Sequence, residues 1–391
     1  MRFSDSLEPF RIPAFTIAAF AILLAILAEA MAGSYMALLA VERAHMGPLE
    51  LSIFLTLSAV SGIGVTAMFG RWHDETPRLW PLVLCLVASV LGYGLCATVT
   101  TPWMLMAIAF FLLGLASASY TLLFAIAKAY LDGRDAPTRS RGMAALRMIS
   151  SLSWAIGPAI GAALVAGWSY PGVFFGASIF ALAALLALFA GRLRAGSPER
   201  SEKNAVRLGG WLSLWPAALA LTLFNTAMFM GSNALSIVTI GDLKGTGTDV
   251  GLLFSLCAAL EVVVMGAYVI WPARRASSTP LVIGFVLFAL YFLAALLLPS
   301  LATLYWGQIL RAAAIGIVGV IGMLYVQDAM PQQAGTAAAL FSNTVNAGWL
   351  LSGVGTGLWA QAFGYWSIFG ACAVLALIGA GLFALPLTRS P

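Results

Sequence analysis

Charged residues are scarce in this sequence of 391 residues. Only 9% of them are Asp, Glu, Lys or Arg, whereas 61% are hydrophobic and the mean hydropathy is +0.97. A soluble globular protein carries about a quarter charged residues, because its surface must face water. The shortage excludes a disordered chain, a collagen and a disulfide scaffold, and it argues against a soluble enzyme. The composition is typical of a polytopic α-helical membrane protein. The apolar runs are continuous, which disfavours the alternating strands of an outer-membrane barrel.

Cysteine and histidine are also rare. The two histidines, His45 and His73, are predicted on opposite sides of the membrane, so no histidine-based metal site is expected. No Gly-rich phosphate loop is joined to a lysine, and no serine pairs with a histidine on one membrane face. The sequence therefore predicts no cofactor, no metal, no ATP drive and no enzymatic activity. The four cysteines lie in apolar runs and are expected to act as small packing residues: Cys85, Cys96, Cys257 and Cys372.

Long apolar runs dominate what the sequence does contain. A helix that crosses a bilayer needs roughly 20 apolar residues, and polar breaks divide this chain into twelve such runs. The predicted fold is therefore an all-α polytopic membrane protein with twelve transmembrane helices. The runs lie near residues 13–41, 50–70, 79–98, 103–129, 143–166, 171–191, 212–240, 249–271, 280–298, 302–326, 335–361 and 364–386.

Lysine and arginine are distributed unevenly between the two sides of the membrane. With twelve spans, sixteen of the 20 basic residues fall on the side of both termini, and only Arg43 and Lys244 fall on the other. Because basic loops stay in the cytoplasm, both termini are predicted to be cytoplasmic. The net charge of +5 then reflects topology and contact with membrane lipid, and nucleic-acid binding is not expected.

The two halves of the sequence look like copies of one another. The polar segment 192–210 separates six runs from six, and Ser151, Trp154 and Pro158 fall on Asn346, Trp349 and Gly353 at a constant offset. We expect a six-helix bundle over residues 1–195, a cytoplasmic linker over 196–210, and a second six-helix bundle over 211–391. Parallel six-helix repeats are typical of secondary transporters, which bind their substrate between the halves.

The polar segment after the second run carries a recognisable pattern. Gly70, Asp74 and Arg78 occupy the first, fifth and ninth places of a motif that resembles the loop 2–3 signature of the major facilitator superfamily. In that family the loop latches neighbouring helices on the cytoplasmic side, so the resemblance implies a gating role for these three residues. Glu75 and Pro77 depart from the pattern.

Several stretches resemble the bacterial sugar efflux transporter family within that superfamily. Ser153, Gly157, Pro158 and Gly161 resemble the fifth-span motif of facilitator antiporters, with Ser153 in place of its first glycine. The resemblance implies an inner-membrane exporter of sugars or sugar-like solutes that works by alternating access and proton antiport, and that is monomeric. The stretches that carry the family likeness are residues 154–158, 230–233, 319–331, 334–336, 342–344 and 348–349.

Four charged residues fall inside the predicted spans, where a charge is costly and usually functional. They are Glu29, Arg147, Glu261 and Arg311. We expect Glu261 to carry the coupled proton rather than Glu29, because it lies in a stretch that resembles the family's eighth span. Arg311 departs from the family expectation, and an ion pair between Glu29 and Arg311 is a reasonable prediction. A buried ion pair without a transport role is the alternative.

Polar and tryptophan side chains recur at helical spacing in three spans. Amides, hydroxyls and indole rings suit a sugar, whose hydroxyls need hydrogen bonds and whose C–H faces stack on aromatic rings. Hydrogen bonds between helices are the alternative role for each of these polar side chains. The candidate substrate-binding residues are Arg147, Ser151, Trp154, Asn225, Ser232, Asn233, Gln308, Asn343, Asn346 and Trp349.

The sequence leaves more than one function open. An exporter of sugars by proton antiport is the first hypothesis, and a multidrug/proton antiporter of the same superfamily is the second. Sugar uptake by proton symport fits less well, because the fifth-span motif favours export. A membrane enzyme or a receptor would need a catalytic cluster or a signalling domain, and neither is visible in the sequence.

Overall fold

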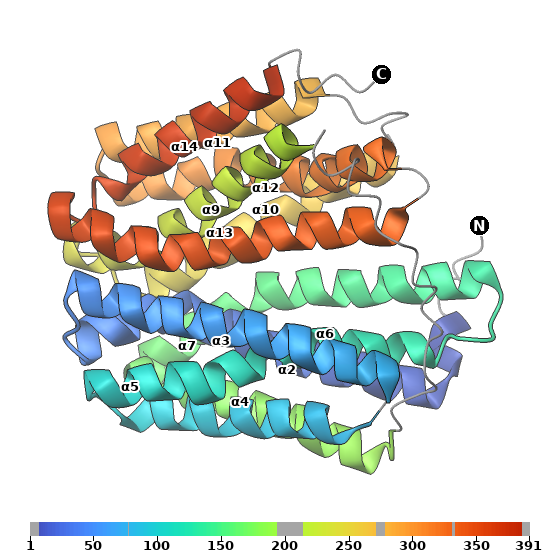
Figure 1. Cartoon of the computed structure of the whole chain (residues 1–391). Coiled ribbons are helices and arrows are strands. Elements are labelled where there is room, and N and C mark those ends of the chain that lie inside the picture. Colours follow the sequence, from blue (N-terminus) through green and yellow to red (C-terminus); the bar gives the residue numbers. More distant parts are fainter. Residues whose placement is uncertain (1–7, 77, 194–213, 271–277, 331–332, 385–391) are drawn as a thin grey trace. The chain divides into compact units, whose positions relative to one another are not determined.

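The computed structural model describes residues 8–76, 78–193, 214–270, 278–330 and 333–384. All of its regular secondary structure in this part of the chain is helical (Figure 1). Nine helical segments of the described residues are long and apolar enough to cross a membrane. The longest of them, Pro137–Ala190, contains two of the predicted spans. Within the described residues, each of the twelve apolar runs overlaps helical structure.

The described helices of the first half run from Glu8 to Ala190. Two of the predicted spans contain a π-helical turn, where the chain accommodates one extra residue per turn. The elements are η1 (Glu8–Arg11), α2 (Pro13–Leu38), η2 (Leu39–Arg43), α3 (Pro48–Glu75), α4 (Trp80–Thr98), α5 (Pro102–Ile108), η3 (Ala109–Leu113), α6 (Gly114–Ala129) and α7 (Ala136–Ala190).

The described helices of the second half run from Trp215 to Ala384. All correspond to the predicted spans, and α14 is the shortest of them. The elements are α9 (Trp215–Gly241), α10 (Gly247–Ile270), α11 (Ser278–Leu297), α12 (Leu301–Ala329), α13 (Ala334–Phe363) and α14 (Ile368–Ala384).

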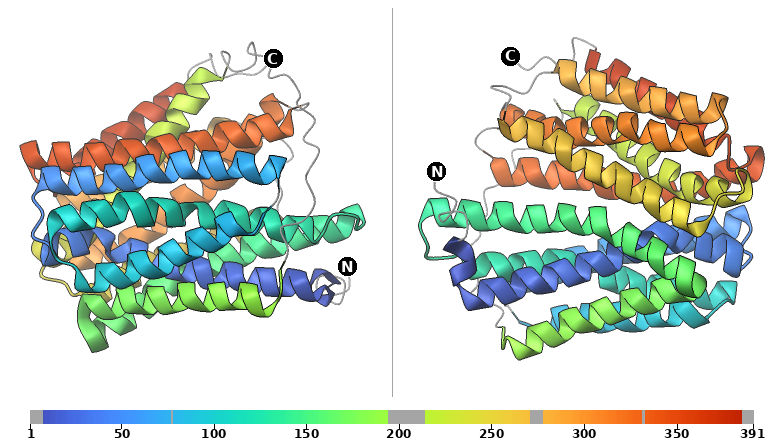
Figure 2. Two further views of the ribbon diagram at one scale, coloured as in Figure 1. Left: turned by 60° about the horizontal axis from the view of Figure 1, so that its bottom comes forward. Right: turned by 180° about the vertical axis from the view of Figure 1, so that it is seen from behind.

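Helix α7 is two arms joined by a sharp break (Figure 2). Trp168 and Ser169 leave the helical conformation, and Ser169 has a φ of 57°. The Cβ of any side chain at Gly172 would lie 2.7 Å from the Cβ of Trp168, so the turn requires glycine there. The break falls between the predicted spans 143–166 and 171–191, and it separates them.

The starts of α3 and α10 are capped in the same way. Glu50 in the first turn of α3 accepts a hydrogen bond from the backbone N–H of Gly47, at 2.9 Å. Asp249 in the first turn of α10 accepts one from the N–H of Thr246, at 2.7 Å. Both carboxylates thus cap their helix in the same way, which satisfies a backbone donor that the helix itself leaves free.

The contacts divide the chain into two compact units. One contains Met1–His45 and Leu57–Glu202, and the other contains Met46–Thr56 and Lys203–Pro391. The first turns of α3 therefore group with the second half. The predicted linker 196–210 lies outside the described residues, so its extent stays a prediction.

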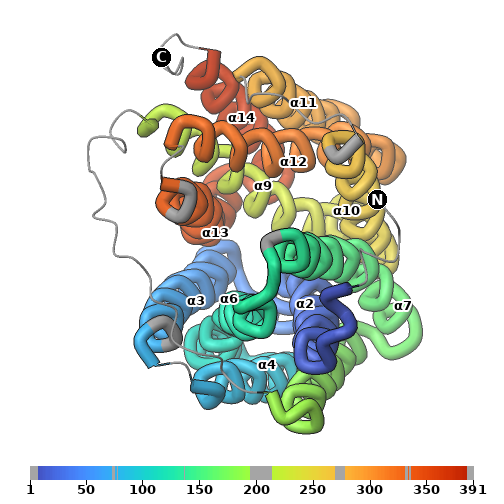
Figure 3. The backbone as a smooth tube through the Cα atoms, turned by 90° about the vertical axis from the view of Figure 1, so that its right-hand side faces the viewer, coloured from blue at the N-terminus to red at the C-terminus, as the bar shows by residue number. Residues whose placement is uncertain are grey.

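Small residues hold α2 and α7 together in the first unit, where the two helices lie side by side (Figure 3). Ser153 is fully buried and donates a hydrogen bond to the carbonyl of Ile149 at 2.9 Å. A Cβ at Gly157 would lie 2.9 Å from that of Ala30, and one at Gly161 would lie 2.7 Å from the ring of Tyr35. Close approach through small residues is how helices associate when lipid removes the hydrophobic drive.

Aromatic rings fill the core of the second unit. Phe288 lies between Phe224 and Phe292, with both ring centroids 4.5 Å away. The rings come from α9 and α11, and Phe369 of α14 extends the cluster. This core fixes α9 beside α11 and α14.

Candidate functional site

Arg311 is the most deeply buried charge among the described residues of the second unit. It lies on α12 with 4% of its surface exposed. Its Nη2 donates a hydrogen bond of 2.7 Å to the hydroxyl of Ser232 on α9, and its Nη1 donates one of 3.3 Å to the side-chain oxygen of Gln308. The amide nitrogen of Gln308 in turn donates to the carbonyl of Leu304 at 2.9 Å. Two of the predicted substrate-binding residues are therefore partners of Arg311.

Aromatic faces complete the surroundings of this guanidinium. Its central carbon lies 5.2 Å from the ring centroid of Phe254 on α10 and 6.0 Å from that of Tyr291 on α11. Within the described part of the second unit, no carboxylate lies within 4.0 Å of it. Ring faces and neutral acceptors thus stabilise the charge. The predicted pair of Glu29 with Arg311 would join the two units and stays a prediction.

Glu261 is a half-buried acid on α10 that makes no hydrogen bond or ion pair with the described residues. It follows Phe254 by seven residues and Cys257 by four, so the three share one face of the helix. Its backbone carbonyl packs near Gly316 of α12, where a Cβ would approach it to 3.6 Å. The acid therefore sits along the same contact between α10 and α12 that holds Phe254 against Arg311.

The stripe predicted on α7 is open, in contrast to the opposite side of the helix. Arg147 is exposed, Ser151 is half-buried, and 42% of the surface of Trp154 is accessible. Ser153 and Gly157, which alternate with these residues, are buried against α2. Glu29 on α2 is half-buried, and no ion pair links it to Arg147 among the described residues of the first unit. The arrangement separates a packing side of α7 from a side that can bind a solute.

Helix α13 also carries an accessible stripe. Asn343 is exposed, while Asn346 and Trp349 are half-buried. Ser352 is buried and donates a hydrogen bond of 2.7 Å to the carbonyl of Trp349. The side chains of Asn343, Asn346 and Trp349 are therefore accessible, and their predicted role in substrate binding stays a prediction.

The two asparagines of α9 have partners within the protein. Asn225 is 7% exposed and donates to the carbonyl of Leu221 at 2.8 Å, and Gly348 of α13 packs directly on it. Asn233 donates to the hydroxyl of Thr356 on α13 at 3.3 Å. These contacts favour the alternative role of both residues, which is to hold α9 against α13.

The predicted gating residues lie at the end of α3 and just beyond it. Gly70 lies within the helix, and Arg78 is exposed in the connection to α4. The side chain of Asp74 and the whole of Pro77 lie outside the described residues. The gating role of Gly70, Asp74 and Arg78 therefore stays a prediction.

Three residues that contact Arg311 or Asn233 were not singled out from the sequence. Phe254 and Tyr291 flank Arg311, and Thr356 binds Asn233. Phe254 could have been found from its spacing to Glu261. Tyr291 sits in an apolar run that gives no sign of its place beside Arg311.

Comparison with known protein families identifies the family to which this helical protein belongs. The profile of the Major Facilitator Superfamily matches residues 18–345. The chain belongs to this superfamily. It is a multi-pass membrane transporter and not an enzyme, as the sequence predicts.

Curated relatives resemble the transporter along nearly its whole length. A protein of Deinococcus radiodurans named "Putative sugar efflux transporter" is 36% identical over 95% of this chain and 97% of its own. Sugar efflux transporter B of Salmonella typhimurium is 30% identical over 88% of each chain. Sugar efflux transporter A of Escherichia coli is 28% identical over 86% and 87%. The predicted kinship with the bacterial sugar efflux transporter family is confirmed.

Solved structures share the fold at low sequence identity. The nucleoside transporter NupG has a TM-score of 0.79 and 11% identity, over 97% of this chain and 100% of its own. A bacterial homologue of the human lysosomal transporter Spinster has a TM-score of 0.75 and 12% identity, over 96% of each chain. These matches confirm the predicted major facilitator fold.

Proposed function

We propose that this transporter exports sugars or sugar-like solutes across the bacterial inner membrane in exchange for protons. The observation that carries the proposal is the open face of α7. A cation, a hydroxyl and an indole ring, from Arg147, Ser151 and Trp154, follow one another at helical spacing opposite the packing seam. The hydroxyl groups of a sugar can form hydrogen bonds with Arg147 and Ser151, and the C–H face of its ring can stack on Trp154. The names of the curated relatives support the same substrate class.

In this proposal, the second unit also contributes substrate-binding residues. Asn343, Asn346 and Trp349 of α13 present amides and an indole at the pseudo-equivalent span. We assign residues 1–195 and 211–391 to two six-helix bundles, with both termini in the cytoplasm. The charge asymmetry of the loops supports that orientation.

Proton coupling is assigned to Glu261 in this proposal. The acid is half-buried in a membrane span and makes no hydrogen bond or ion pair with the described residues. It shares a helix face with Phe254, which contacts Arg311. Removing a carboxylate from water favours its neutral form, so such a group can take up and release a proton. Glu29 is the alternative carrier, because it is also half-buried and unpaired among the described residues.

Transport by the purified protein tests the proposal directly. Proteoliposomes containing the transporter should exchange radiolabelled hexoses or disaccharides against an unlabelled pool, and an imposed proton gradient should drive their accumulation. A multidrug antiporter is the competing function, and an unpaired acid such as Glu29 would suit its cationic substrates. Exchange of cationic dyes without any sugar exchange would favour that function and overturn ours.

A further inference from the structure

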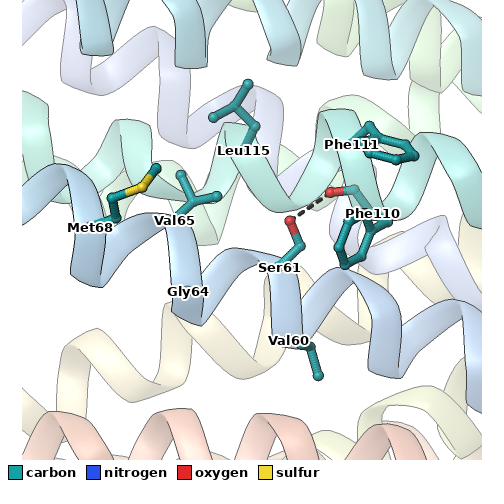
Figure 4. Close-up of a pocket in the computed structure, with 8 residues that line it drawn as sticks. All are labelled: Val60, Ser61, Gly64, Val65, Met68, Phe110, Phe111 and Leu115. Atoms are coloured by element: carbon teal, nitrogen blue, oxygen red, sulfur yellow. Dashed lines mark hydrogen bonds between the residues drawn. The ribbon is translucent and has the colours of Figure 1, made fainter.

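An apolar groove lies between α3 and the span formed by α5, η3 and α6 in the first unit (Figure 4). Its volume is about 390 Å³. Helix α3 contributes residues from Val60 to Met68, and the facing span contributes Phe110, Phe111 and Leu115. None of these residues belongs to the solute site proposed above.

The groove is built by small residues and by the π-helical turn η3. Gly114 packs directly on Ser61, which brings the two spans into close contact at this point. Ser61 donates a hydrogen bond of 2.6 Å to the carbonyl of Phe110, an oxygen in the π-helical turn (Figure 4). Gly64 lies one turn further along α3, and nothing lies within 4 Å of the position that its Cβ would take. The contact at Gly114 thus forms the base of the groove, and Gly64 leaves it hollow.

The lining suits a hydrocarbon chain rather than a solute with hydroxyl groups. Ser61 is the polar side chain among the lining residues, and its hydroxyl is already bound to the carbonyl of Phe110. Large apolar side chains are exposed around the groove, with 68% of Phe111, 48% of Val60 and 41% of Met68 accessible. In a membrane span such side chains face lipid tails, whereas a path for a sugar needs free hydrogen-bonding groups.

A cation lies at one end of the same stripe of α3. Val60, Gly64, Met68 and Arg71 are spaced so that they follow one face of the helix. Arg71 is exposed and makes no ion pair with the described residues. The eleven helical steps from Val60 to Arg71 rise about 16 Å, which is about half of the hydrocarbon thickness of a bilayer. The groove and Arg71 therefore span one leaflet.

Aromatic rings mark the membrane boundary at that same end. The ring of Trp72 lies 5.6 Å from that of Phe69 and 5.9 Å from that of Trp80. Trp72 is 44% exposed and Trp80 is 46% exposed. Exposed tryptophans gather at the level of the lipid headgroups. Arg71 precedes Trp72 in the sequence, so we place its guanidinium at the level of the lipid phosphates.

We propose that this groove binds one acyl chain of an anionic phospholipid, and that Arg71 binds its phosphate. In the orientation proposed above, the lipid belongs to the cytoplasmic leaflet. The bound chain covers exposed apolar surface between α3 and α6, and it contacts the π-helical turn of the fourth span. The site is distinct from the solute site, so solute binding is not required for it.

Native mass spectrometry of the purified, delipidated transporter tests this site. Phosphatidylglycerol is titrated against phosphatidylcholine with the same acyl chains. The wild-type protein should retain one phosphatidylglycerol at concentrations where phosphatidylcholine does not bind. Gly64→Phe places a ring in the groove and should remove that first bound lipid. Arg71→Gln should weaken phosphatidylglycerol binding about fivefold, because one basic residue at a membrane surface contributes about that much, and should leave phosphatidylcholine unchanged.

Matched controls distinguish the site from general effects on the membrane surface. Gly381→Phe changes an exposed helical glycine of α14 that also has nothing within 4 Å of its Cβ position. Arg134→Gln removes an exposed cation from another loop. Neither should change the first binding event. Equal lipid binding by Gly64→Phe and wild type would overturn the groove, and an unchanged headgroup preference in Arg71→Gln would overturn the role of Arg71. Should Gly64→Phe not fold, Gly64→Leu provides the same comparison.

Discussion

The guanidinium of Arg311 and the hydroxyl of Ser232 share a 2.7 Å hydrogen bond although 79 residues separate them in the sequence. The bond joins α12 to α9 inside the second unit and provides a partner for a charge that is only 4% exposed. A buried charge without a carboxylate partner depends on every hydrogen bond it makes. Ser232 therefore holds Arg311 in position without any bound solute.

Removing the hydroxyl of Ser232 should destabilise the transporter through Arg311. Ser232→Ala should cost about 1–3 kcal/mol, the usual effect of leaving a buried donor unsatisfied. Arg311→Met retains apolar bulk without the charge and should cost less. In the double variant the cost of Ser232→Ala should nearly vanish, because no donor is left to satisfy. Unfolding in detergent, followed by tryptophan fluorescence, measures the cycle, and additive costs would show that the two residues act independently.

The seam between α2 and α7 predicts opposite effects for two alanine substitutions. Gly157→Ala places a methyl group 2.9 Å from the Cβ of Ala30 and 3.2 Å from the carbonyl oxygen of Leu27. Overpacking of this kind costs about 1–3 kcal/mol. Gly33→Ala, on the open side of α2, meets nothing within 4 Å and should stabilise the helix by up to about 1 kcal/mol. Thermal unfolding measures the stability of both variants. If Gly157→Ala were as stable as Gly33→Ala, the close packing of α2 against α7 would be contradicted.

Trp154 should contribute to solute binding and not to stability. Its ring is 42% exposed on the open face of α7, so Trp154→Ala removes little packing. Loss of stacking should weaken sugar binding by about 1–3 kcal/mol, a range taken from bases stacked on aromatic rings and generous for a sugar. Trp154→Phe should recover part of the affinity. The control is Trp168→Ala, at an exposed position within the break in α7, which should bind as wild type does. Scintillation proximity binding measures all three, and wild-type affinity in Trp154→Ala would contradict the proposed site.

The membrane-spanning helices could be predicted from the sequence, because the length of an apolar run decides whether a segment can cross a bilayer. The break at Trp168 and Ser169 separates two predicted spans that secondary structure joins into one helix. The fifth-span motif was also visible, and the structure shows that its glycines pack against α2. Gly157 and Gly161 lie in the packing seam with α2, and the polar stripe lies on the other side.

The partners of each polar residue were not predictable. Ser232 and Gln308 have the chemistry to bind a hydroxyl, and nothing in their spacing reveals that Arg311 binds both. Asn225 looks like a substrate ligand until the glycine of another helix, Gly348, is found packed on it. Side-chain identity constrains what a group can bind, but contacts between distant helices decide what it does bind.

Glu261 leads to the most demanding prediction, because it concerns coupling rather than binding. The acid makes no hydrogen bond or ion pair with the described residues, and it lies on the α10 face whose Phe254 contacts Arg311. Glu261→Gln retains the shape and polarity of the protonated side chain but cannot release a proton. It should therefore bind sugar and exchange labelled against unlabelled sugar as wild type does, while losing accumulation driven by a proton gradient.

Glu29→Gln is the matched variant, because Glu29 is the other half-buried acid that has no partner among the described residues of its own unit. Under our assignment it should keep most of its gradient-driven accumulation. Inverted vesicles with an imposed pH gradient measure accumulation, and counterflow in the same preparation measures exchange. If Glu29→Gln loses accumulation and Glu261→Gln keeps it, the proton carrier is Glu29. If both variants keep it, neither carboxylate couples transport to protons, because a permanently neutral side chain at the coupling site cannot complete the cycle.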